Sequence, residues 1–320
     1  MAGQKIVFMG TPRFSIPTIE ELISSSYHVV AVYTQPDQPS GRGQRLAASA
    51  VKRVALEHGL AVNQPQSLRQ QAEIDRLGEL SPDVIIVAAY GHILPQQVLD
   101  IPPYGCLNVH PSLLPRHRGA SPIAAAILSG DEETGVSIML MDAGMDTGPI
   151  IAQTRVIIEA HDTTESLEDR LSRAGADLLM QTLPLWFEGQ LTPQPQDDSK
   201  ATYSKVVHKQ DGEIDWRLPA VELWRQVRAF HPWPGSYTRW RGRMLKVLEA
   251  AAIPRGGELV PGRVIELEVG LSMPLGVETG DGVLALARVQ LEGRKAMAAA
   301  DFLRGAQGLV GEVLGSKALS

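Results

Sequence analysis

The chain has 320 residues, a formal net charge of −6 at pH 7, 44% hydrophobic residues and 21% charged residues. This composition is ordinary for a soluble globular protein and leaves room for two domains. A single cysteine excludes an intrachain disulfide and a cysteine-rich zinc site. No apolar run approaches the roughly 20 residues of a membrane span, and the first apolar run is too short for a secretory signal. We therefore expect a cytoplasmic protein with no membrane contact. We also expect a monomer.

The first half of the chain alternates apolar runs with helical patterns. Strands are predicted at Lys5–Met9, Val29–Tyr33, Val84–Ala89, Leu107–His110, Val136–Met141 and Ile150–Ile158, and helices at Ile16–Ser24, Ala47–His58, Ser121–Gly130 and from about Asp162. Near-continuous apolar strands separated by helices are typical of a parallel sheet that is covered on both faces. Residues 1–189 are therefore predicted to form an α/β domain with a Rossmann-like, mostly parallel sheet.

The composition of the chain changes beyond residue 189. Residues 191–202 are rich in Pro, Gln, Asp and Ser without apolar periodicity, so 190–206 is predicted to be a linker. One helix is expected near Ala220–Phe230. Strand-like runs then recur between glycine-rich turns at Met244–Leu248, Arg263–Leu267, Gly276–Glu278 and Val283–Ala287. This pattern favours a small OB-like β-barrel over residues 207–320.

Three polar residues in the first half form the strongest candidate site. Leu107 and Val109 alternate with Asn108 and His110, which in a strand places the amide and the imidazole on one face. Ligands of open α/β sheets bind at the carboxyl ends of the strands. Asp146 lies in a glycine-flanked loop that can bring a carboxylate to the imidazole. No activated Ser or Cys lies beside them, so the trio suits direct attack on a carbonyl through an oxyanion.

Other readings of these residues stay open. A lone histidine at a strand end is commonly structural, and His110 with Asp146 also qualifies as a pair of metal ligands. Against a metal, Asn108 is a poor ligand and no third ligand stands at a convincing spacing. The turn after the first strand lacks the glycine patterns of nicotinamide or ATP sites, so neither cofactor is expected.

Two arginine-bearing segments are candidates for contact with an anion. The loop Gln35–Arg45 is long for a strand-to-helix connection, and it carries Arg42 between two glycines and ends on Arg45. Guanidinium groups on such a loop suit phosphate capture, although a solvated surface loop explains it as well. Arg239–Arg243 has three arginines at period two, which on one strand would share a face. Residues 205–320 hold 16 Lys and Arg against 13 Asp and Glu, a net charge of +3 in an acidic chain.

Taken together, these segments resemble the formyltetrahydrofolate-dependent formyltransferases, and the match runs nearly end to end. It is carried by Phe8–Phe14, Thr34–Gly43, Ala88–Pro95, Asn108–Pro115, Arg118–Gly119, Asp142–Gly148 and Phe230–Gly235. The pattern around Asn108, His110 and Asp146 is specific to the formyl-transfer domain. That domain also serves purine and sugar-amine substrates, but the arginine loop and the C-terminal barrel are similar to members that act on initiator methionyl-tRNA.

The resemblance implies an enzyme that moves a formyl group from 10-formyltetrahydrofolate to the free α-amine of methionyl initiator tRNA, for translation initiation and without a metal. By resemblance Asn108, His110 and Asp146 match the catalytic residues, with His110 expected in its protonated form. The residues that match the folate loop are Ser112, Leu113, Leu114 and Pro115. Arg42 and Arg45 are the candidate RNA contacts.

Three alternative functions remain. A 10-formyltetrahydrofolate hydrolase would use the same trio with water as the acceptor, and it would have no need of the Arg42 loop. A non-catalytic tRNA-binding protein would keep the barrel, but its retention of all three polar groups would then be unexplained. A formyltransferase for another amine is the third alternative. The identity of the formylated product separates them.

Overall fold

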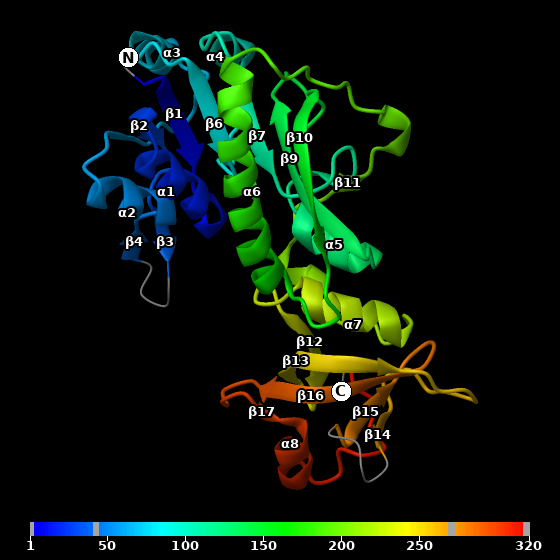
Figure 1. The fold of residues 1–320 in the computed structure, drawn as a ribbon. Helices are drawn as coiled ribbons and strands as arrows, with labels where there is room; N and C mark the ends of the chain where they lie inside the picture. The colour runs from blue at the N-terminus through cyan, green and yellow to red at the C-terminus, as the bar shows by residue number, and fades with distance from the viewer. Residues whose placement is uncertain (1–2, 41–44, 268–272, 316–320) are drawn as a thin grey trace. The chain divides into compact units, whose positions relative to one another are not determined.

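The protein is described from a computed structural model, which covers residues 3–40, 45–267 and 273–315. It divides into two compact units (Figure 1). The first comprises Met1–Pro122, Glu133–Ile157 and Leu167–Ser204, and the second comprises Ile123–Glu132, Ile158–Ser166 and Lys205–Ser320. No helix of the described residues is long and apolar enough to cross a bilayer.

A seven-stranded sheet forms the centre of the first unit (Figure 1). Its strands are β1 (Lys5–Gly10), β2 (His28–Tyr33), β5 (Val62–Asn63), β6 (Val84–Ala88), β7 (Cys106–His110), β9 (Glu133–Leu140) and β10 (Ile150–Ile157). The spatial order is β10-β9-β7-β6-β1-β2-β5, and the five strands from β7 to β5 pair in parallel. β9 and β10 continue the sheet antiparallel. The predicted α/β, mostly parallel fold is confirmed.

Both faces of the sheet are covered, which explains the continuous apolar runs of its strands. On one face Val7, Met9, Val87 and Cys106 pack in a core cluster with residues of α3 (Gln71–Glu79) and α4 (Gln96–Leu99). On the other face lies α6 (Thr164–Phe187), whose Gly175 sits against β7 and β9. α1 (Ile16–Ser24) and α2 (Ala50–Glu57) pack on each other.

Two small strand pairs also belong to the first unit. β3 (Gln38–Ser40) and β4 (Arg45–Ala47) pair antiparallel and flank residues 41–44, which lie outside the described part of the chain. β8 (Arg118–Gly119) pairs in parallel with β11 (Tyr203–Ser204). The second of these pairs ties the late segment 194–204 to the loops that follow β7.

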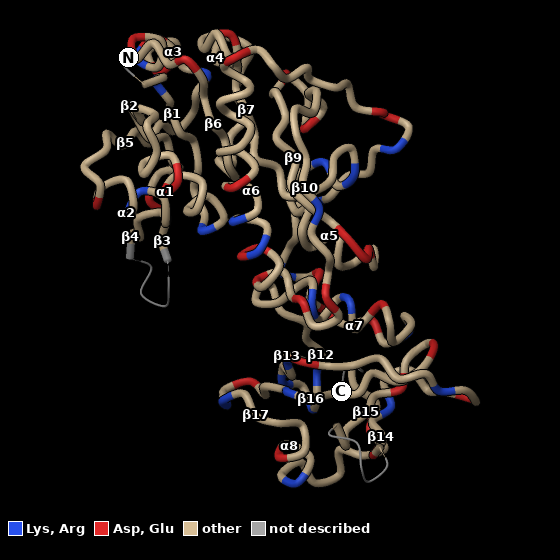
Figure 2. Tube along the Cα trace, in the orientation of Figure 1, with Lys and Arg blue, Asp and Glu red and all other residues tan. Residues whose placement is uncertain are grey.

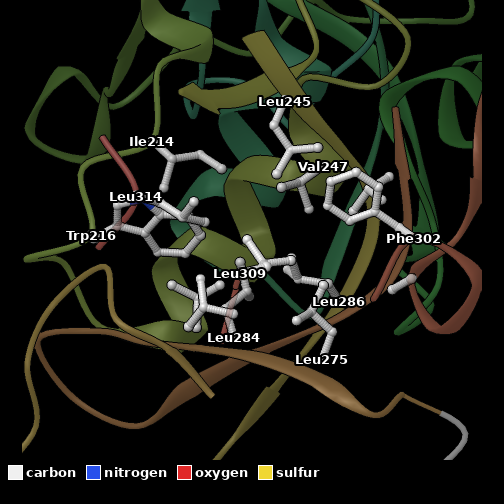
Figure 3. Packing of buried hydrophobic residues seen from close by; sticks show 14 of the residues in the cluster. Ile214, Trp216, Leu245, Val247, Leu275, Leu284, Leu286, Phe302, Leu309 and Leu314 are labelled. Carbon is white, nitrogen blue, oxygen red and sulfur yellow. The ribbon is translucent and has the colours of Figure 1, made fainter. Parts of the chain in front are cut away.

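The second unit is an antiparallel, curled half-barrel sheet in the order β12-β13-β16-β15-β14, with β17 paired to β16. Its elements are α7 (Ala220–Ala229), β12 (Ser236–Trp240), β13 (Arg243–Ile253), β14 (Val264–Glu266), β15 (Leu275–Glu278), β16 (Val283–Leu291), β17 (Met297–Ala298) and α8 (Ala299–Gly305); α5 (Pro122–Ser129) falls largely in this unit as well. Alternating apolar residues of the strands form its core with Trp216 and Phe302 (Figure 3). The predicted barrel domain is confirmed.

Some sequence-based expectations were wrong. The Arg239–Arg243 run is not one strand, because Arg241 (φ +47°) and Gly242 (φ +74°) form the turn of the β12–β13 hairpin. Two positive φ values in a two-residue loop are the geometry of a type I′ turn, so the three arginines do not share a strand face. Beyond α7 the chain also holds the helix α8, whose seven residues give too little periodicity to be recognised. The helix expected from Ala47 begins at Ala50, after the β3–β4 hairpin.

Candidate active site

The β7 strand presents Asn108 and His110 on one face of the sheet, as the alternation predicts. Leu107 and Val109 point to the other face, where a Cβ added to Gly175 of α6 would lie 2.7 Å from Val109 Cγ1. The glycine therefore lets the helix approach closely enough to seal the apolar side of the strand. His110 is the last residue of β7, and it is 4% exposed, whereas Asn108 is 9% exposed. Both polar side chains are thus almost completely shielded from solvent at the strand end.

Asp146 reaches the same face from the loop between β9 and β10. Met141, at the start of this loop, packs on the cluster that also contains Cys106 of β7. The Asp146 Oδ1 lies 3.8 Å from His110 Nδ1, and its Oδ2 accepts a hydrogen bond of 2.7 Å from the Gly119 N–H. Asp146 has φ +54°, in the left-handed region that Asp tolerates better than most residues. The structure therefore brings the three predicted residues together.

The surroundings of His110 set its charge. Its Nε2 lies 3.2 Å from the His117 carbonyl oxygen, a distance at which an N–H donates a hydrogen bond. Burial lowers the pKa of His110 below its ordinary value, and the opposing effects of the Asp146 carboxylate and the His117 carbonyl do not overcome it. Both ring nitrogens thus face oxygen atoms, Nδ1 the Asp146 carboxylate and Nε2 the His117 carbonyl. Burial favours the neutral imidazole and the carboxylate favours the imidazolium, so the protonated form expected for His110 stays a prediction.

The Asn108 side chain differs from its neighbours in having no partner. Within residues 3–40, 45–267 and 273–315, its amide makes no hydrogen bond, although the residue is only 9% exposed. A buried amide normally finds a partner in the protein, in water or in a ligand. The Asn108 amide is therefore available to a bound group.

The loop from Ser112 to Pro115 is held by hydrogen bonds to neighbouring residues. The Ser112 hydroxyl donates to the Arg116 carbonyl, and the Ser112 carbonyl accepts from the Ser137 hydroxyl of β9. The Leu114 N–H donates to the same Ser137 hydroxyl at 3.1 Å. Ser112 is fully buried and Leu114 is 3% exposed, whereas Leu113 and Pro115 are half-buried. A ligand at this loop would meet Leu113 and Pro115 rather than the other two side chains.

A second loop, after β6, supplies an apolar surface. Ala89 and Gly91 both have positive φ (+48° and +83°), so the chain turns sharply at the strand end. Ile93 is 74% exposed there, and His92 Nε2 is buried without a partner among the described residues. An exposed aliphatic side chain beside an unused polar atom fits an organic ligand that carries both apolar and hydrogen-bonding groups.

The candidate RNA contacts are placed less completely. Arg42 lies outside the described residues, and Arg45 begins β4, where it pairs with Ser40. In the second unit Figure 2 shows Lys and Arg interspersed with Asp and Glu. Two arginines of the β12–β13 hairpin are engaged within that unit: Arg241 pairs with Glu312, and Arg243 donates to the Glu292 carbonyl.

No metal centre is evident in the described ranges, where no group of three or more His, Cys, Asp and Glu side chains is arranged to hold an ion. The second carboxylate oxygen of Asp146 is taken by a backbone N–H, and His110 Nε2 faces a carbonyl. One atom of each group therefore already has a partner within the protein.

Sequence reasoning missed two residues that hold the site's loops. Arg118 is 1% exposed, and its guanidinium donates to Gln196 and Asp198 and to the Tyr203 hydroxyl. Gln196 in turn donates to the carbonyls of Asp146 and Gly148. The polar 191–202 segment carries no periodicity, so nothing in the sequence marks Gln196 as different from the other glutamines there.

The chain combines a Rossmann-like sheet that carries an Asn, His and Asp site with a β-barrel that follows it. Comparison with known proteins assigns this combination to a family. The family model described as formyl transferase matches residues 4–183, and the one for the formyl transferase C-terminal domain matches residues 207–307. The chain belongs to the formyl transferase family.

Among its curated relatives are methionyl-tRNA formyltransferases. The one from Dehalococcoides mccartyi strain BAV1 is 49% identical over 97% of this chain and 98% of its own length, and the one from Roseiflexus sp. strain RS-1 is 48% identical over 97% and 95%.

Two solved structures share the fold. An N-formyltransferase from Helicobacter canadensis, in complex with folinic acid and dTDP-3-aminofucose, has a TM-score of 0.64 at 17% identity and is matched over 88% of this chain and 99% of its own. HypX from Aquifex aeolicus in complex with tetrahydrofolic acid has a TM-score of 0.60 at 16% identity, over 98% and 49%.

Proposed function

We propose that the protein transfers the formyl group of 10-formyltetrahydrofolate to the α-amine of methionine carried by initiator tRNA, a step of translation initiation. The observation that carries the proposal is the unpartnered Asn108 amide beside the buried His110–Asp146 pair. A ready donor next to a proton-accepting imidazole is what attack of an amine on a formyl carbon requires. The curated methionyl-tRNA formyltransferases that match nearly the whole chain support the same acceptor.

The protons that move during the reaction assign a role to each residue of the site. The methionine amine attacks the formyl carbon, a C–N bond forms, and the carbonyl oxygen gains negative charge that the Asn108 amide stabilises. Neutral His110 takes the proton that the amine loses, and its imidazolium form returns one proton to N10 of the folate as the old C–N bond breaks. The products are formylated methionyl-tRNA and tetrahydrofolate. His110 acts as a base and then as an acid, which its lowered pKa permits.

Asp146 is proposed to stabilise the imidazolium form that His110 adopts during the reaction. Its carboxylate, 3.8 Å from Nδ1, faces the nitrogen that is free to take a proton. An opposite charge at this distance stabilises the imidazolium without abolishing the neutral form at rest. Asp146 is therefore proposed to orient His110 and to hold the transferred proton on it.

The formyl donor is a substrate of the reaction, and the loops around β6 and β7 are proposed to hold it. Leu113 and Pro115 of the 112–115 loop, with Ile93 of the loop after β6, offer apolar surface for its rings. The buried Ser112 and Leu114 would shape the loop instead of contacting the ligand.

The acceptor side of the proposal rests on Arg42 and Arg45 and on residues 207–320. We assign residues 1–189 to catalysis and folate binding, residues 190–206 to the connection, and the β-barrel to the tRNA. The protein is further proposed to act as a cytoplasmic monomer.

The test uses purified protein, formyl-labelled 10-formyltetrahydrofolate and initiator tRNA charged with methionine. Label in the methionyl-tRNA supports the proposal. Release of free formate, with or without tRNA, would instead identify a hydrolase. Label in an added amino sugar or purine precursor, with none in the tRNA, would move the protein to another branch of the family.

Replacing Arg42 with Ala is expected to impair use of the tRNA by about 10-fold or more in kcat/KM while barely changing the KM for the folate. The reason is its place between Gly41 and Gly43 in a long polar segment, far in sequence from the 112–115 loop. Steady-state kinetics with varied tRNA at several salt concentrations measure the effect.

The salt dependence separates two kinds of contact. Loss of a phosphate contact reduces the slope of log affinity against log salt by about one unit, whereas loss of a base contact leaves the slope and changes which tRNA is preferred. Wild-type parameters for tRNA at every salt concentration would remove this segment from the proposed tRNA site.

A further inference from the structure

One side chain joins the two loops that supply the partners of His110. Gln196 Oε1 accepts hydrogen bonds from Arg118 Nε and Nη2 at 3.0 and 2.9 Å, and Gln196 Nε2 donates to the carbonyls of Asp146 and Gly148 at 2.8 and 2.7 Å. The amide thus uses both its oxygen and its nitrogen within the first unit. Glutamine is suited to this place because one end of its amide accepts and the other donates.

Each bridged loop contributes one partner of His110. The loop that contains Arg118 carries the His117 carbonyl, 3.2 Å from His110 Nε2, and the Gly119 N–H that binds the Asp146 carboxylate. The other loop carries Asp146 itself. Loss of the bridge would let the two loops move independently, and the distance between Asp146 and Nδ1 would no longer be fixed.

We propose that Gln196 is a positioning residue that sets the His110–Asp146 pair by tying the 116–119 loop to the 142–148 loop. This inference rests on the proposed function. Gln196 lies in a segment whose composition is that of a linker. It would act on the reaction through its contacts with the two loops, without touching the reacting atoms.

Two features favour a role for the bridge in holding the two loops in place. Asp146 has φ +54°, which is strained for a residue with a side chain, and its own carbonyl is one of the two that Gln196 fixes. Arg118 is almost fully buried, so the direction of its guanidinium is set by its partners Gln196, Asp198 and Tyr203. The 116–119 loop is anchored further by Thr202, whose hydroxyl accepts from the His117 N–H at 2.8 Å.

The first variant is Gln196→Leu, which replaces the amide by an apolar group and removes its hydrogen bonds. Its kcat is expected to fall about 10- to 100-fold with little change in the KM values for folate and tRNA, because small misplacement of a catalytic group is costly and no substrate contact is lost. Gln194→Leu is the matched control. Gln194 is exposed in the same segment and its side chain bonds only locally, to the Thr192 carbonyl, so wild-type kinetics are expected.

A second variant, Gln196→Glu, covers the case in which the first does not fold. A carboxylate still accepts from Arg118, but it cannot donate to the Asp146 and Gly148 carbonyls. Its melting temperature is expected to stay near that of the wild type while kcat falls as in Gln196→Leu. Wild-type kcat in Gln196→Glu would overturn the proposal.

The closing experiment follows the titration of His110 by NMR in the protein without substrates, in wild type and in Gln196→Leu. Among the described residues, the ionisable groups that face His110 are Asp146 and His117. Since the Asp146 carboxylate raises the pKa of His110, its displacement should lower that pKa, and in the Asp146→Asn background the same substitution should have almost no further effect. An unchanged pKa, or equal effects in both backgrounds, would contradict the inference. Failure of the wild type to formylate methionyl-tRNA would reject the proposed function separately, because this titration does not depend on activity.

Discussion

Replacing His110 with Ala should lower kcat by about 10³-fold, and replacing Asn108 with Ala should lower it by about 10²-fold or more. The imidazole is the only proton carrier the proposed reaction has at the strand end, and general acid–base catalysis typically contributes 10²- to 10⁴-fold. Loss of an oxyanion donor costs about 2.7–4 kcal/mol in the barrier. Single-turnover formylation of methionyl-tRNA at saturating folate measures both effects directly.

Both residues are buried, so their variants need a control for folding. Melting temperature and binding of a folate analogue should stay close to wild type, because neither side chain carries much of the apolar core. An Asn108→Ala enzyme with normal turnover would show that the amide does not stabilise the oxyanion. Normal turnover in the His110 variant would place the proton transfer elsewhere.

The Asp146→Asn enzyme should be slower by about 10²-fold and yet less sensitive to acid. The carboxylate opposes the burial that lowers the pKa of His110, so its removal lowers this pKa further. Activity requires the neutral imidazole, and the wild-type rate is lost as pH falls through the His110 pKa. In the variant that loss moves to lower pH, while kcat falls at every pH because the imidazolium has lost its counter-charge. The pH profile of kcat/KM measures both changes.

Asn is the right replacement at this position. Its side-chain oxygen still accepts from the Gly119 N–H, and Asn tolerates the φ of +54° at least as well as Asp. A structural defect is therefore not expected. An acid limb that stays in place or moves to higher pH would show that Asp146 is not the electrostatic partner of His110.

The sequence predicts the central sheet well because the strands are buried on both faces and their apolar runs are continuous. The same reasoning places Asn108 and His110 on one side of β7, since strand alternation is fixed by backbone geometry. It fails where tertiary contacts decide. The Arg239–Arg243 run has strand-like alternation, but Arg241 and Gly242 adopt the turn of a hairpin.

The direction in which the pKa of His110 is shifted is also beyond a sequence pattern. A neighbouring carboxylate in the sequence suggests a raised pKa, whereas the extent of burial reverses the direction and is known only from the fold. The hydrogen bonds of Gln196 to the two loops cannot be predicted from the sequence for a similar reason. They depend on where a polar, aperiodic segment crosses two loops that lie some 50 and 78 residues earlier in the chain.

The buried Arg118 has a consequence for dissection of the protein and for its synthesis. A fragment truncated at Gly189 would lack Gln196, Asp198 and Tyr203, so the Arg118 guanidinium would lose these side-chain partners. The 116–119 loop would then no longer be tied to the 142–148 loop, so such a fragment would loosen at the loops around β8 although its sheet is complete. On the ribosome, likewise, the catalytic loops cannot lock until the chain has emerged through Ser204, whose hydroxyl donates to the Arg118 carbonyl. An autonomous catalytic fragment therefore has to extend past this residue.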